Sequence, residues 1–446
     1  MAKSRPVYVC EACGAQRPKW QGQCDDCGAW NSLTEQAPVA AASRPVTAAS
    51  PARLDSIDES ADSRVTTGLT ELDRVLGGGL VPGSVTLIGG DPGIGKSTLL
   101  LQAAAHLSAS SQVLYVTGEE SLRQVSLRGH RLGVSGASVE VLAATGVEQI
   151  AATAASMRPV LVIIDSIQTL VSDNLTAAAG TVSQVRESAS QLVRLAKGSG
   201  IAVILVGHVT KEGSIAGPRV LEHMVDTVLY FESDIGSRLR LIRAVKNRFG
   251  AANEIGVFAM TAEGLREVSN PSAIFVSRHG EAVPGSVVMV AREGTRPLLV
   301  EVQALVDDAQ SGHPRRLSVG LEQNRLALLL AVAHRHGGVS LAGQDVFVNV
   351  VGGVRVGETA ADLPALLAAV SSLRDRPIAR DTICFGEVGL AGEIRPVPFG
   401  EERLQEAIKQ GFRRAIVPAA NKPRRSPGDI EIIAVDRVAA ALDHAG

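Results

Sequence analysis

The sequence predicts an α/β fold in three parts: a small cysteine-rich module, a parallel sheet covered on both faces, and a separate α+β domain. Three observations carry this prediction. Four of the five cysteines fall within the first 27 residues. Buried-strand runs such as "PVLVIID" alternate with apolar helices through the middle of the chain, as in doubly covered parallel sheets. From about residue 273 shorter strands mix with helices, which indicates a different domain.

The bulk composition narrows the function. A chain of 446 residues can form two or three domains with sizeable cores. A formal net charge of −2 argues against a globally basic nucleic-acid coat, so any DNA or RNA contact must come from local patches. No apolar run approaches the roughly 18 residues of a membrane span, and "MAKSRPVYVC" lacks the apolar core of a signal peptide. We therefore expect a soluble cytoplasmic protein with no membrane partner.

The cysteines form two C-x2-C pairs, Cys10 with Cys13 and Cys24 with Cys27, separated by ten residues. Four thiolates at this spacing can surround Zn²⁺, whose binding supplies folding energy that so short a segment lacks. Redox pairs or disulfides are the alternative, and a reducing cytosol disfavours them. We predict a structural zinc module over residues 1–32.

Three residues between the cysteine pairs, Arg17, Lys19 and Trp20, have two open interpretations. They either meet a nucleic-acid backbone and base, or cap the small module. Residues 33–62 are rich in Ala, Ser and Pro without an apolar period, which predicts a flexible linker.

The strongest motif is a P-loop. An apolar strand ending near Ile88 runs into G-x-x-x-x-G-K-S and then an apolar helix, which is the strand–loop–helix setting that the motif requires. Backbone N–H groups of such a loop wrap phosphates, the lysine reaches the β and γ phosphates, and the serine ligates Mg²⁺. The predicted ATP and Mg²⁺ site comprises Gly90, Asp91, Pro92, Gly93, Ile94, Gly95, Lys96, Ser97 and Thr98.

Polar residues end three further strands at the edge where open α/β sheets place their ligands. Asp165 ends "LVIID" and is predicted to bind Mg²⁺, directly or through water. Glu119 and Glu120 follow "VLYVTG", where a carboxylate can deprotonate the attacking water. His208 ends "AVILVGH" and either senses the γ-phosphate or bonds only to backbone.

The stretch "AVKNRFG" places Lys246 and Arg248 in the connection between two predicted strands. Two cations at such a point are either an ordinary solvated loop or groups aimed at a phosphate. The residues alone leave open whether that phosphate belongs to a nucleotide or to a nucleic acid.

The C-terminal region carries a set of clustered cations. Each one alone is most simply a solvated surface residue. Taken together, they could form a surface that contacts a DNA backbone. The set is Arg315, Arg316, Arg325, Arg413, Arg414, Lys422, Arg424 and Arg425. Cys384, in "TICFGEV", is predicted to be a buried strand residue.

With these motifs, the chain resembles the RadA (Sms) family of bacterial DNA-repair proteins over essentially its whole length. The markers are the four-cysteine module, the P-loop segment, "YVTGEES", "KNRFG" and "GEVGLAGEIRPV". The resemblance implies a RecA-like P-loop ATPase core over residues 63–272. It also implies a hexameric, ring-forming, DNA-dependent ATPase that drives branch migration of single-stranded and branched DNA intermediates alongside a RecA-type recombinase.

The resemblance also assigns residue roles. Glu119, ahead of Glu120, falls on the catalytic glutamate of RecA-like cores. Lys246 and Arg248 fall on a cation cluster that reaches a neighbouring subunit's γ-phosphate, and a guanidinium suits bidentate phosphate contact. Nucleotide in trans is thus the first interpretation of "KNRFG" and DNA the second. The segment 211–219, "KEGSIAGPR", is the better candidate for a DNA-facing loop.

Residues 273–446 resemble the proteolytic domain of Lon proteases, which needs a serine nucleophile activated by a lysine. The chain departs from that pattern at both positions, since Ala360 aligns with the serine and Glu401 with the lysine. Ser371 and Ser372 lie nearby but late in the predicted helix. We expect a non-proteolytic domain; an ATP-dependent peptidase and a nucleotide-switched, DNA-bound scaffold that does not translocate are the alternatives.

Overall fold

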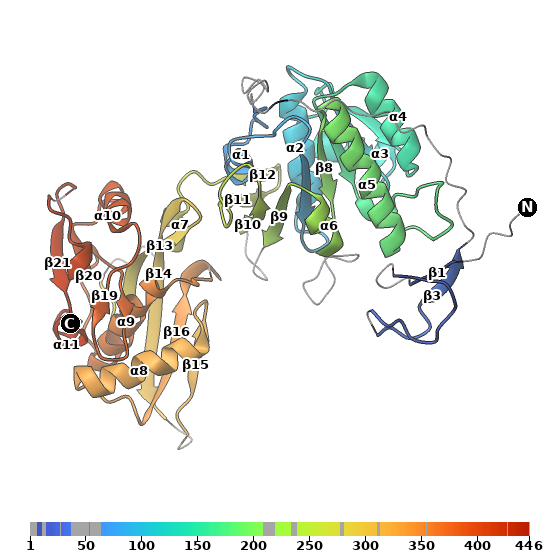
Figure 1. Ribbon diagram of the computed structural model, residues 1–446. Helices are drawn as coiled ribbons and strands as arrows, with labels where there is room; N and C mark the ends of the chain where they lie inside the picture. Colours follow the sequence, from blue (N-terminus) through green and yellow to red (C-terminus); the bar gives the residue numbers. More distant parts are fainter. Residues whose placement is uncertain are drawn as a thin grey trace, which may run out of the picture. The chain divides into compact units, whose positions relative to one another are not determined.

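The computed structural model describes residues 7–10, 15–26, 28–36, 53, 64–207, 219–232, 239–276, 281–309, 313–353, 355–425 and 427–445. The chain divides into two compact units, residues 1–268 and 269–446, drawn in Figure 1. Among the described helices, none is long and apolar enough to cross a membrane. Several predicted features lie outside the described residues: Cys13, Cys27, His208, the segment 211–218 and most of the predicted linker.

The cysteine module is a three-stranded antiparallel sheet in the order β2–β1–β3. Its strands are β1 (Val7–Cys10), β2 (Gln16–Arg17) and β3 (Leu33–Gln36). Strand β3 pairs with β1, and Leu33 packs against Cys10 and Cys24. The predicted end of the module at residue 32 was therefore too early, because the apolar Leu33 closes its small core instead of opening a linker.

The first unit is built on a nine-stranded sheet in the order β12–β11–β10–β9–β4–β8–β7–β5–β6. The strands from β9 to β6 in that order pair in parallel, and β10, β11 and β12 extend the sheet as an antiparallel edge. The strands are β4 (Val85–Gly89), β5 (Val113–Thr117), β6 (Glu140–Ala143), β7 (Leu161–Asp165), β8 (Ala202–Val206), β9 (Thr227–Glu232), β10 (Leu239–Asn247), β11 (Ile255–Thr261) and β12 (Gly264–Glu267).

Helices cover both faces of this sheet, and the strand sequences show why (Figure 1). In β7, Leu161 and Ile163 join the core beneath α1, α2 and α3, whereas Val162 and Ile164 join the core beneath α4, α5 and α6. Both faces are buried, so the central strands are continuously apolar. The helices are α1 (Thr70–Leu76), α2 (Lys96–Leu107), α3 (Leu122–Arg131), α4 (Val147–Met157), α5 (Val182–Ser199) and α6 (Arg219–Met224).

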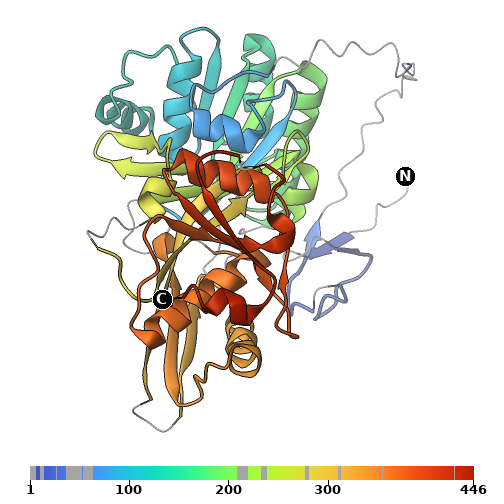
Figure 2. The same cartoon turned by 90° about the vertical axis from the view of Figure 1, so that its left-hand side faces the viewer.

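The second unit is an α+β domain on a seven-stranded sheet in the order β15–β16–β14–β13–β17–β20–β21 (Figure 2). Helix α9 is buried along most of its length and packs on β13 and β14. The strands are β13 (Ser286–Glu293), β14 (Arg296–Asp308), β15 (Arg316–Val319), β16 (Gln344–Val350), β17 (Thr382–Cys384), β20 (Arg414–Pro418) and β21 (Glu431–Val435), with the hairpin β18 (Glu387–Val388) and β19 (Ile394–Arg395). The helices are α7 (Ser272–Phe275), α8 (Gln323–Gly337), α9 (Asp362–Arg374), α10 (Gly400–Lys409) and α11 (Val438–Leu442).

Candidate nucleotide-binding and hydrolytic site

The loop after β4 has the backbone that the P-loop motif predicts. Gly90, Gly93 and Gly95 all have positive φ, at 148°, 76° and 119°. A Cβ at Gly90 would lie 2.7 Å from Cβ of Phe231, so that position also needs glycine for close approach. Helix α2 begins directly afterwards at Lys96. The local sequence therefore forms a tight strand–loop–helix turn at the carboxyl end of β4.

Lys96 lies inside this turn. Its Nζ donates hydrogen bonds to the carbonyl oxygens of Gly90, at 2.6 Å, and Asp91, at 2.9 Å. Burial lowers the pKa of the Lys96 amine, and the carboxylates of Asp165, Asp91 and Glu119 act against that shift. A buried cation whose hydrogen-bond acceptors are neutral carbonyls gains from an added anion.

The surroundings of Lys96 fit the phosphates of a nucleotide. The N-cap of α2 is Gly95, and no side chain caps the first N–H groups of the helix. A Cβ at Gly93 would meet nothing within 4 Å, so the loop opens on free space at that point. Uncapped N–H groups, a helix N-terminus and a lysine are the donors that bind phosphate in proteins. Ser97 and Thr98, in the first turn of α2, add hydroxyl groups.

The predicted carboxylates lie at the same edge of the sheet. Strands β4, β8, β7 and β5 are consecutive parallel neighbours, so their carboxyl ends meet at one edge. Thr117 and Asp165 are in register across β5 and β7, and the N–H of Gly118 donates to the Asp165 carbonyl at 3.0 Å. The structure therefore brings together Lys96, Asp165 and Glu119, which the sequence predicted as one site.

The two adjacent glutamates have different partners. The Ser166 hydroxyl donates to Oε1 of Glu119 at 2.5 Å. Arg128 of α3 holds Glu120 in an ion pair, and the Glu120 N–H donates to the Thr117 hydroxyl at 3.0 Å. Glu120 is thus tied to α3, whereas Glu119 stays beside the strand that carries Asp165.

Sequence reasoning missed three supporting residues: Ser166, Arg128 and Tyr115. Tyr115, which is fully buried, donates its hydroxyl to Oδ2 of Asp165 at 2.5 Å. Burial raises the pKa of this phenol well above its usual range, so it stays a donor. Ser166 directly follows Asp165 and could have been flagged from that adjacency. Arg128 and Tyr115 carry no signal in the sequence.

Lys246 and Arg248 lie level with the amino-terminal ends of the parallel strands, whereas the P-loop of their own chain follows the carboxyl end of β4. We call these two ends the opposite edge and the carboxyl edge of the sheet, respectively. Strand β10 runs antiparallel to β9, so it ends level with the start of β4. Asn247 pairs with Thr227, which in turn pairs with Thr86 near the start of β4. The P-loop follows the other end of β4. The chain therefore does not bring these two cations to its own predicted nucleotide site.

Each of the two cations has a partner within the chain. Nζ of Lys246 donates to the carbonyl oxygens of Glu222 and Val225, at 2.7 and 2.8 Å, at the C-terminal end of α6. Arg248 lies 3.3 Å from Oδ1 of the buried Asp226, although 60% of its side chain is exposed. Burial, followed by the charge of Arg248, lowers the pKa of Lys246, and neighbouring acids oppose the shift. Lys246 is therefore held by neutral oxygens and would gain from a charged acceptor.

The turn that carries these cations is fixed against α1. The side-chain amide of Asn247 donates to the carbonyl of Val75 at 3.1 Å, and its oxygen accepts the Phe249 N–H at 2.9 Å. A Cβ at Gly250 would lie 2.8 Å from Cα of Gly77, the left-handed cap of α1. Glycine is needed at both contacts. The motif "KNRFG" is thus a fixed corner that displays Arg248, rather than an ordinary solvated loop.

Two of the four predicted zinc ligands, Cys10 and Cys24, lie among the described residues. Cys10 and Cys24, the first thiol of each pair, are buried in the same small cluster. Their N–H groups each donate at 2.9 Å to the carbonyl five residues on, at Ala15 and Ala29. The described residues thus place two of the four predicted thiols in one cluster, and thiolates are the ligands that structural zinc sites use. Such a metal would hold the two turns together and supply folding energy.

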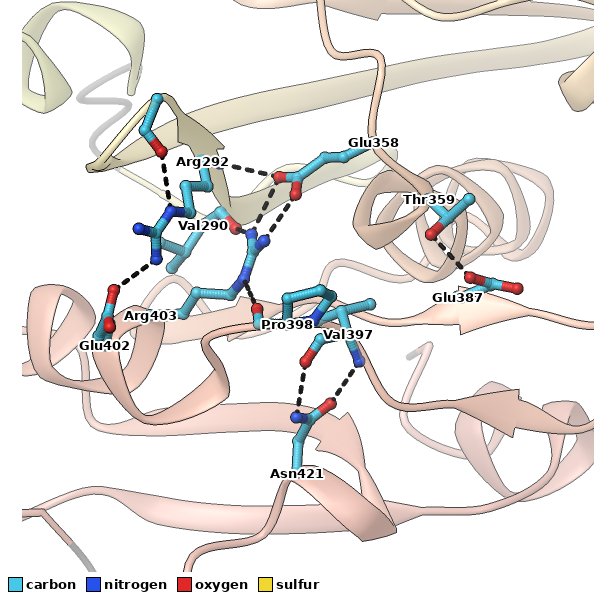
Figure 3. Close-up of polar contacts among 11 residues, drawn as sticks. Val290, Arg292, Glu358, Thr359, Glu387, Val397, Pro398, Glu402, Arg403 and Asn421 are labelled. Carbon is cyan, nitrogen blue, oxygen red and sulfur yellow. Dashed lines mark hydrogen bonds and ion pairs between the residues drawn. The ribbon is translucent and has the colours of Figure 1, made fainter. Parts of the chain in front are cut away.

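In the second unit an ion pair joins the two segments that align with the serine and lysine positions of Lon proteases (Figure 3). Arg403 of α10, 1% exposed, donates to both carboxylate oxygens of Glu358, at 2.9 and 2.6 Å, and to the carbonyl of Val290. Ala360, where the serine was expected, is buried two residues after Glu358. Glu401, where the lysine was expected, is exposed at the start of α10.

The nearby serines are committed to backbone. Ser371 is fully buried, accepts the Gly285 N–H at 3.1 Å and donates to the Arg376 carbonyl. Ser372 accepts the Val306 N–H at 3.0 Å. Cys384 is confirmed as a buried residue of β17, and burial raises its thiol pKa well above the usual range.

The predicted basic surface of the second unit is partly neutralised. Arg315 pairs with Asp345 at 2.6 Å, and Arg325 forms an ion pair with the buried Asp362. These two arginines thus connect elements of the fold. Arg315 is nevertheless largely exposed, and Arg316 is half-buried. Arg414 is exposed but lies 3.9 Å from Asp381 and 3.7 Å from Glu431. The other exposed cations of the predicted set are Arg413, Lys422, Arg424 and Arg425.

The fold and site define the class: a P-loop, RecA-like ATPase core between a zinc ribbon and a Lon-protease-like α+β domain. Family models agree, with an AAA domain matching residues 48–214, a rubredoxin metal binding domain residues 8–35, and subunit ChlI of Mg-chelatase residues 321–421. Among solved structures, one ATPase domain aligns with 47% of this chain and 94% of its own, at 18% identity and a TM-score of 0.42.

Curated relatives match the chain from end to end. DNA repair protein RadA of Pseudomonas aeruginosa is 60% identical, that of Escherichia coli 56% and that of Bacillus subtilis 50%. Each alignment covers 99% of this chain and 99% of the relative. The chain belongs to the RadA family of DNA repair proteins.

Proposed function

We propose that the protein is a DNA-dependent ATPase that acts as a motor in homologous recombination and DNA repair. It promotes branch migration of single-stranded and branched DNA intermediates together with a RecA-type recombinase. The relatives' name supports the repair role, and the family resemblance supports the finer activity. The protein works as a hexameric ring, with ATP, Mg²⁺ and Zn²⁺ as its cofactors.

In this proposal the carboxyl edge of the sheet holds ATP and Mg²⁺. Lys96 and the backbone N–H groups of the loop from Gly90 to Thr98, which Pro92 lines without an N–H of its own, bind the phosphates, while Ser97 and Asp165 bind Mg²⁺. Glu119 accepts the proton of the attacking water. Glu120 is unsuited to that role because Arg128 holds it. His208, which lies outside the described residues, is proposed to sense the γ-phosphate.

One observation carries the motor proposal: Lys246 and Arg248 stand at the sheet edge opposite their own P-loop. We propose that they complete the site of a neighbouring subunit, where they stabilise charge on the transferred phosphoryl group. For Lys246, a phosphate would replace the two neutral carbonyl acceptors at the end of α6 with a charge-assisted partner. A site completed by a neighbour couples hydrolysis to ring geometry, as a translocating motor requires.

The test is ATP turnover with and without single-stranded DNA. A motor of this kind hydrolyses ATP faster when the DNA is present. A nucleotide-switched scaffold would bind DNA without that stimulation. An ATP-dependent peptidase would cleave unfolded protein, which we do not expect because an alanine and a glutamate stand at the dyad positions. Absence of DNA stimulation would contradict the proposal.

The zinc module has its own test. The purified protein should contain about one zinc per chain, and Cys27→Ser should lose it while the motor fold, followed by circular dichroism, persists. Metal analysis that finds two disulfides and no zinc would reverse the assignment.

A further inference from the structure

The only two tryptophans of the chain lie in the cysteine module, and both face solvent. Trp20 is 55% exposed and Trp30 is 71% exposed. Indole rings are large and apolar, so a pair left in water on a module this small calls for a ligand. The proposed ATP chemistry uses neither residue.

The two rings border the same small space. A Cβ built at Gly22 would lie 3.9 Å from Cη2 of Trp20 and 3.9 Å from Cζ3 of Trp30. Since Gly22 has no side chain, nothing of its own stands between the rings. The backbone holds Trp30 beside Gly22, because Gln23 and Trp30 form an antiparallel bridge and the Asn31 N–H donates to the Gly22 carbonyl at 2.7 Å. Trp20 lies two residues before Gly22 in the chain.

The charges around the rings favour an anionic partner. Arg17 pairs with two acids of the module, at 2.7 Å from Asp26 and 3.6 Å from Asp25, while Glu35 of β3 accepts the hydroxyl of Tyr8. Lys19, next to Trp20 in the chain, is exposed and has no ion pair among the described residues. A cation beside exposed aromatic rings is the combination that binds single-stranded nucleic acid.

A protein partner fits these observations less well. The apolar cluster of the module, made of Cys10, Cys24 and Leu33, is buried, so among the described residues of the module the large apolar side chains open to a partner are the two indole rings. The residues from Gln21 to Gln23 next to the rings are polar or glycine. Protein interfaces need an apolar core ringed by contacts that exclude water. Base stacking needs only exposed π-faces.

We propose that Trp20 and Trp30 form a stacking platform for unpaired bases of single-stranded DNA, with Lys19 contacting a neighbouring phosphate. This inference rests on the proposed DNA-dependent function and adds where the cysteine module meets the strand. The motor unit and the module would then grip the same DNA.

The experiment is a titration of the full-length protein with an oligothymidylate, followed by intrinsic tryptophan emission. All of that emission comes from Trp20 and Trp30, so quenching reports only on the platform. Anisotropy of a dye-labelled oligothymidylate measures total binding in parallel. We expect quenching that saturates with the same midpoint as the anisotropy.

Variants give the second measurement. Trp30→Ala should weaken oligothymidylate binding about tenfold, whereas the matched control Trp30→Phe keeps a stacking ring and most of the affinity. Lys19→Ala should reduce the slope of log affinity against log salt by about 0.7, the value for one single-strand phosphate contact. Zinc content and circular dichroism verify that each variant is folded.

The outcomes separate the platform from the proposed function. Binding by anisotropy with unchanged tryptophan emission, and with Trp30→Ala binding like the wild type, would overturn the platform while the DNA-dependent motor stands. Unchanged oligothymidylate binding by Trp30→Ala, together with loss of binding to a recombinase, would overturn it in favour of a protein-docking site. No anisotropy change at all would contradict both proposals.

Discussion

The two edges of the nine-stranded sheet in the first unit carry different chemical groups. At the carboxyl edge, Lys96, Asp165 and Glu119 converge on a loop with uncapped N–H groups. At the opposite edge, Lys246 and Arg248 sit on a fixed corner, where Lys246 donates to carbonyl oxygens. The carboxyl edge carries the hydrogen-bond donors and carboxylates of a nucleotide site. The opposite edge carries two cations but no P-loop. The comparison is the basis of our proposal that a single chain holds two halves of different sites.

The second unit differs, because charged groups of the two segments that align with the dyad pair with each other. Arg403 donates hydrogen bonds to both carboxylate oxygens of Glu358, and this ion pair joins the segments that align with the serine and the lysine of Lon proteases (Figure 3). A guanidinium held by a carboxylate and backbone carbonyls is committed to structure. The polar groups of the Glu358–Arg403 pair are satisfied within the chain, and we therefore place the proposed activity in the first unit.

The largest effect is expected at the carboxyl edge. Lys96→Ala should abolish ATP hydrolysis, a loss of at least about 10³-fold, because the phosphates lose their cation within the same chain. Steady-state phosphate release measures it, and circular dichroism verifies folding. Turnover near the wild-type rate would show that the carboxyl edge is not the site.

At the opposite edge, Lys246→Ala should cut hydrolysis by about 10³-fold, as loss of a finger-type cation does. Nucleotide binding should stay nearly intact, because the P-loop of the same chain is untouched. Arg248→Ala should act in the same direction. The exposed Arg266 of β12 supplies a control, since Arg266→Ala removes a cation of the same unit from outside the site. Normal basal turnover in Lys246→Ala, without DNA, would assign the corner to DNA.

The two glutamates sharpen the comparison within one edge. Glu119→Gln should lower kcat by about 10²-fold or more with little change in KM, since a general base is lost. Glu120→Gln weakens only the contact with Arg128 and should cost less than about tenfold. Equal losses, or a larger loss at Glu120, would reverse the assignment of the base.

A smaller effect, on stability alone, is expected in the second unit. Arg403→Met should destabilise it by about 3 kcal/mol, because the carboxylate of Glu358 is left without its partner. Adding Glu358→Met should recover part of that loss, since no charge is then stranded. Urea unfolding followed by circular dichroism measures both variants. A double variant less stable than Arg403→Met would show that the pair is not coupled in this way.

Local patterns explain what could be predicted from the sequence. The P-loop is a contiguous motif. Asp165 and Glu119 come at or just after the ends of apolar strands, and the carboxyl ends of neighbouring parallel strands lie at one edge of the sheet, so their proximity could be predicted. The partners of Lys246 are backbone oxygens at the end of α6, 24 and 21 residues earlier in the chain, and the ion pair of Arg403 and Glu358 spans 45 residues. No periodicity encodes such contacts.

Short or unusual elements were missed for a related reason. Strand β15 (Arg316–Val319) has only four residues and follows a run of cations, so its sequence resembles a loop. It forms because it pairs in parallel with β16. Strand β3 was likewise taken for linker, since Leu33 becomes apolar core only when β1 and the buried cysteines lie beside it.

The most direct test of the central claim mixes two inactive chains. Lys246→Ala keeps an intact P-loop but lacks the cation for its neighbour, and Lys96→Ala supplies that cation with a dead P-loop. In a mixed ring, interfaces that join the intact halves should hydrolyse ATP, so mixing should restore partial turnover that neither variant shows alone. If the mixed sample stays as inactive as its components, although subunit exchange is verified by labelled chains, the site is not shared between subunits.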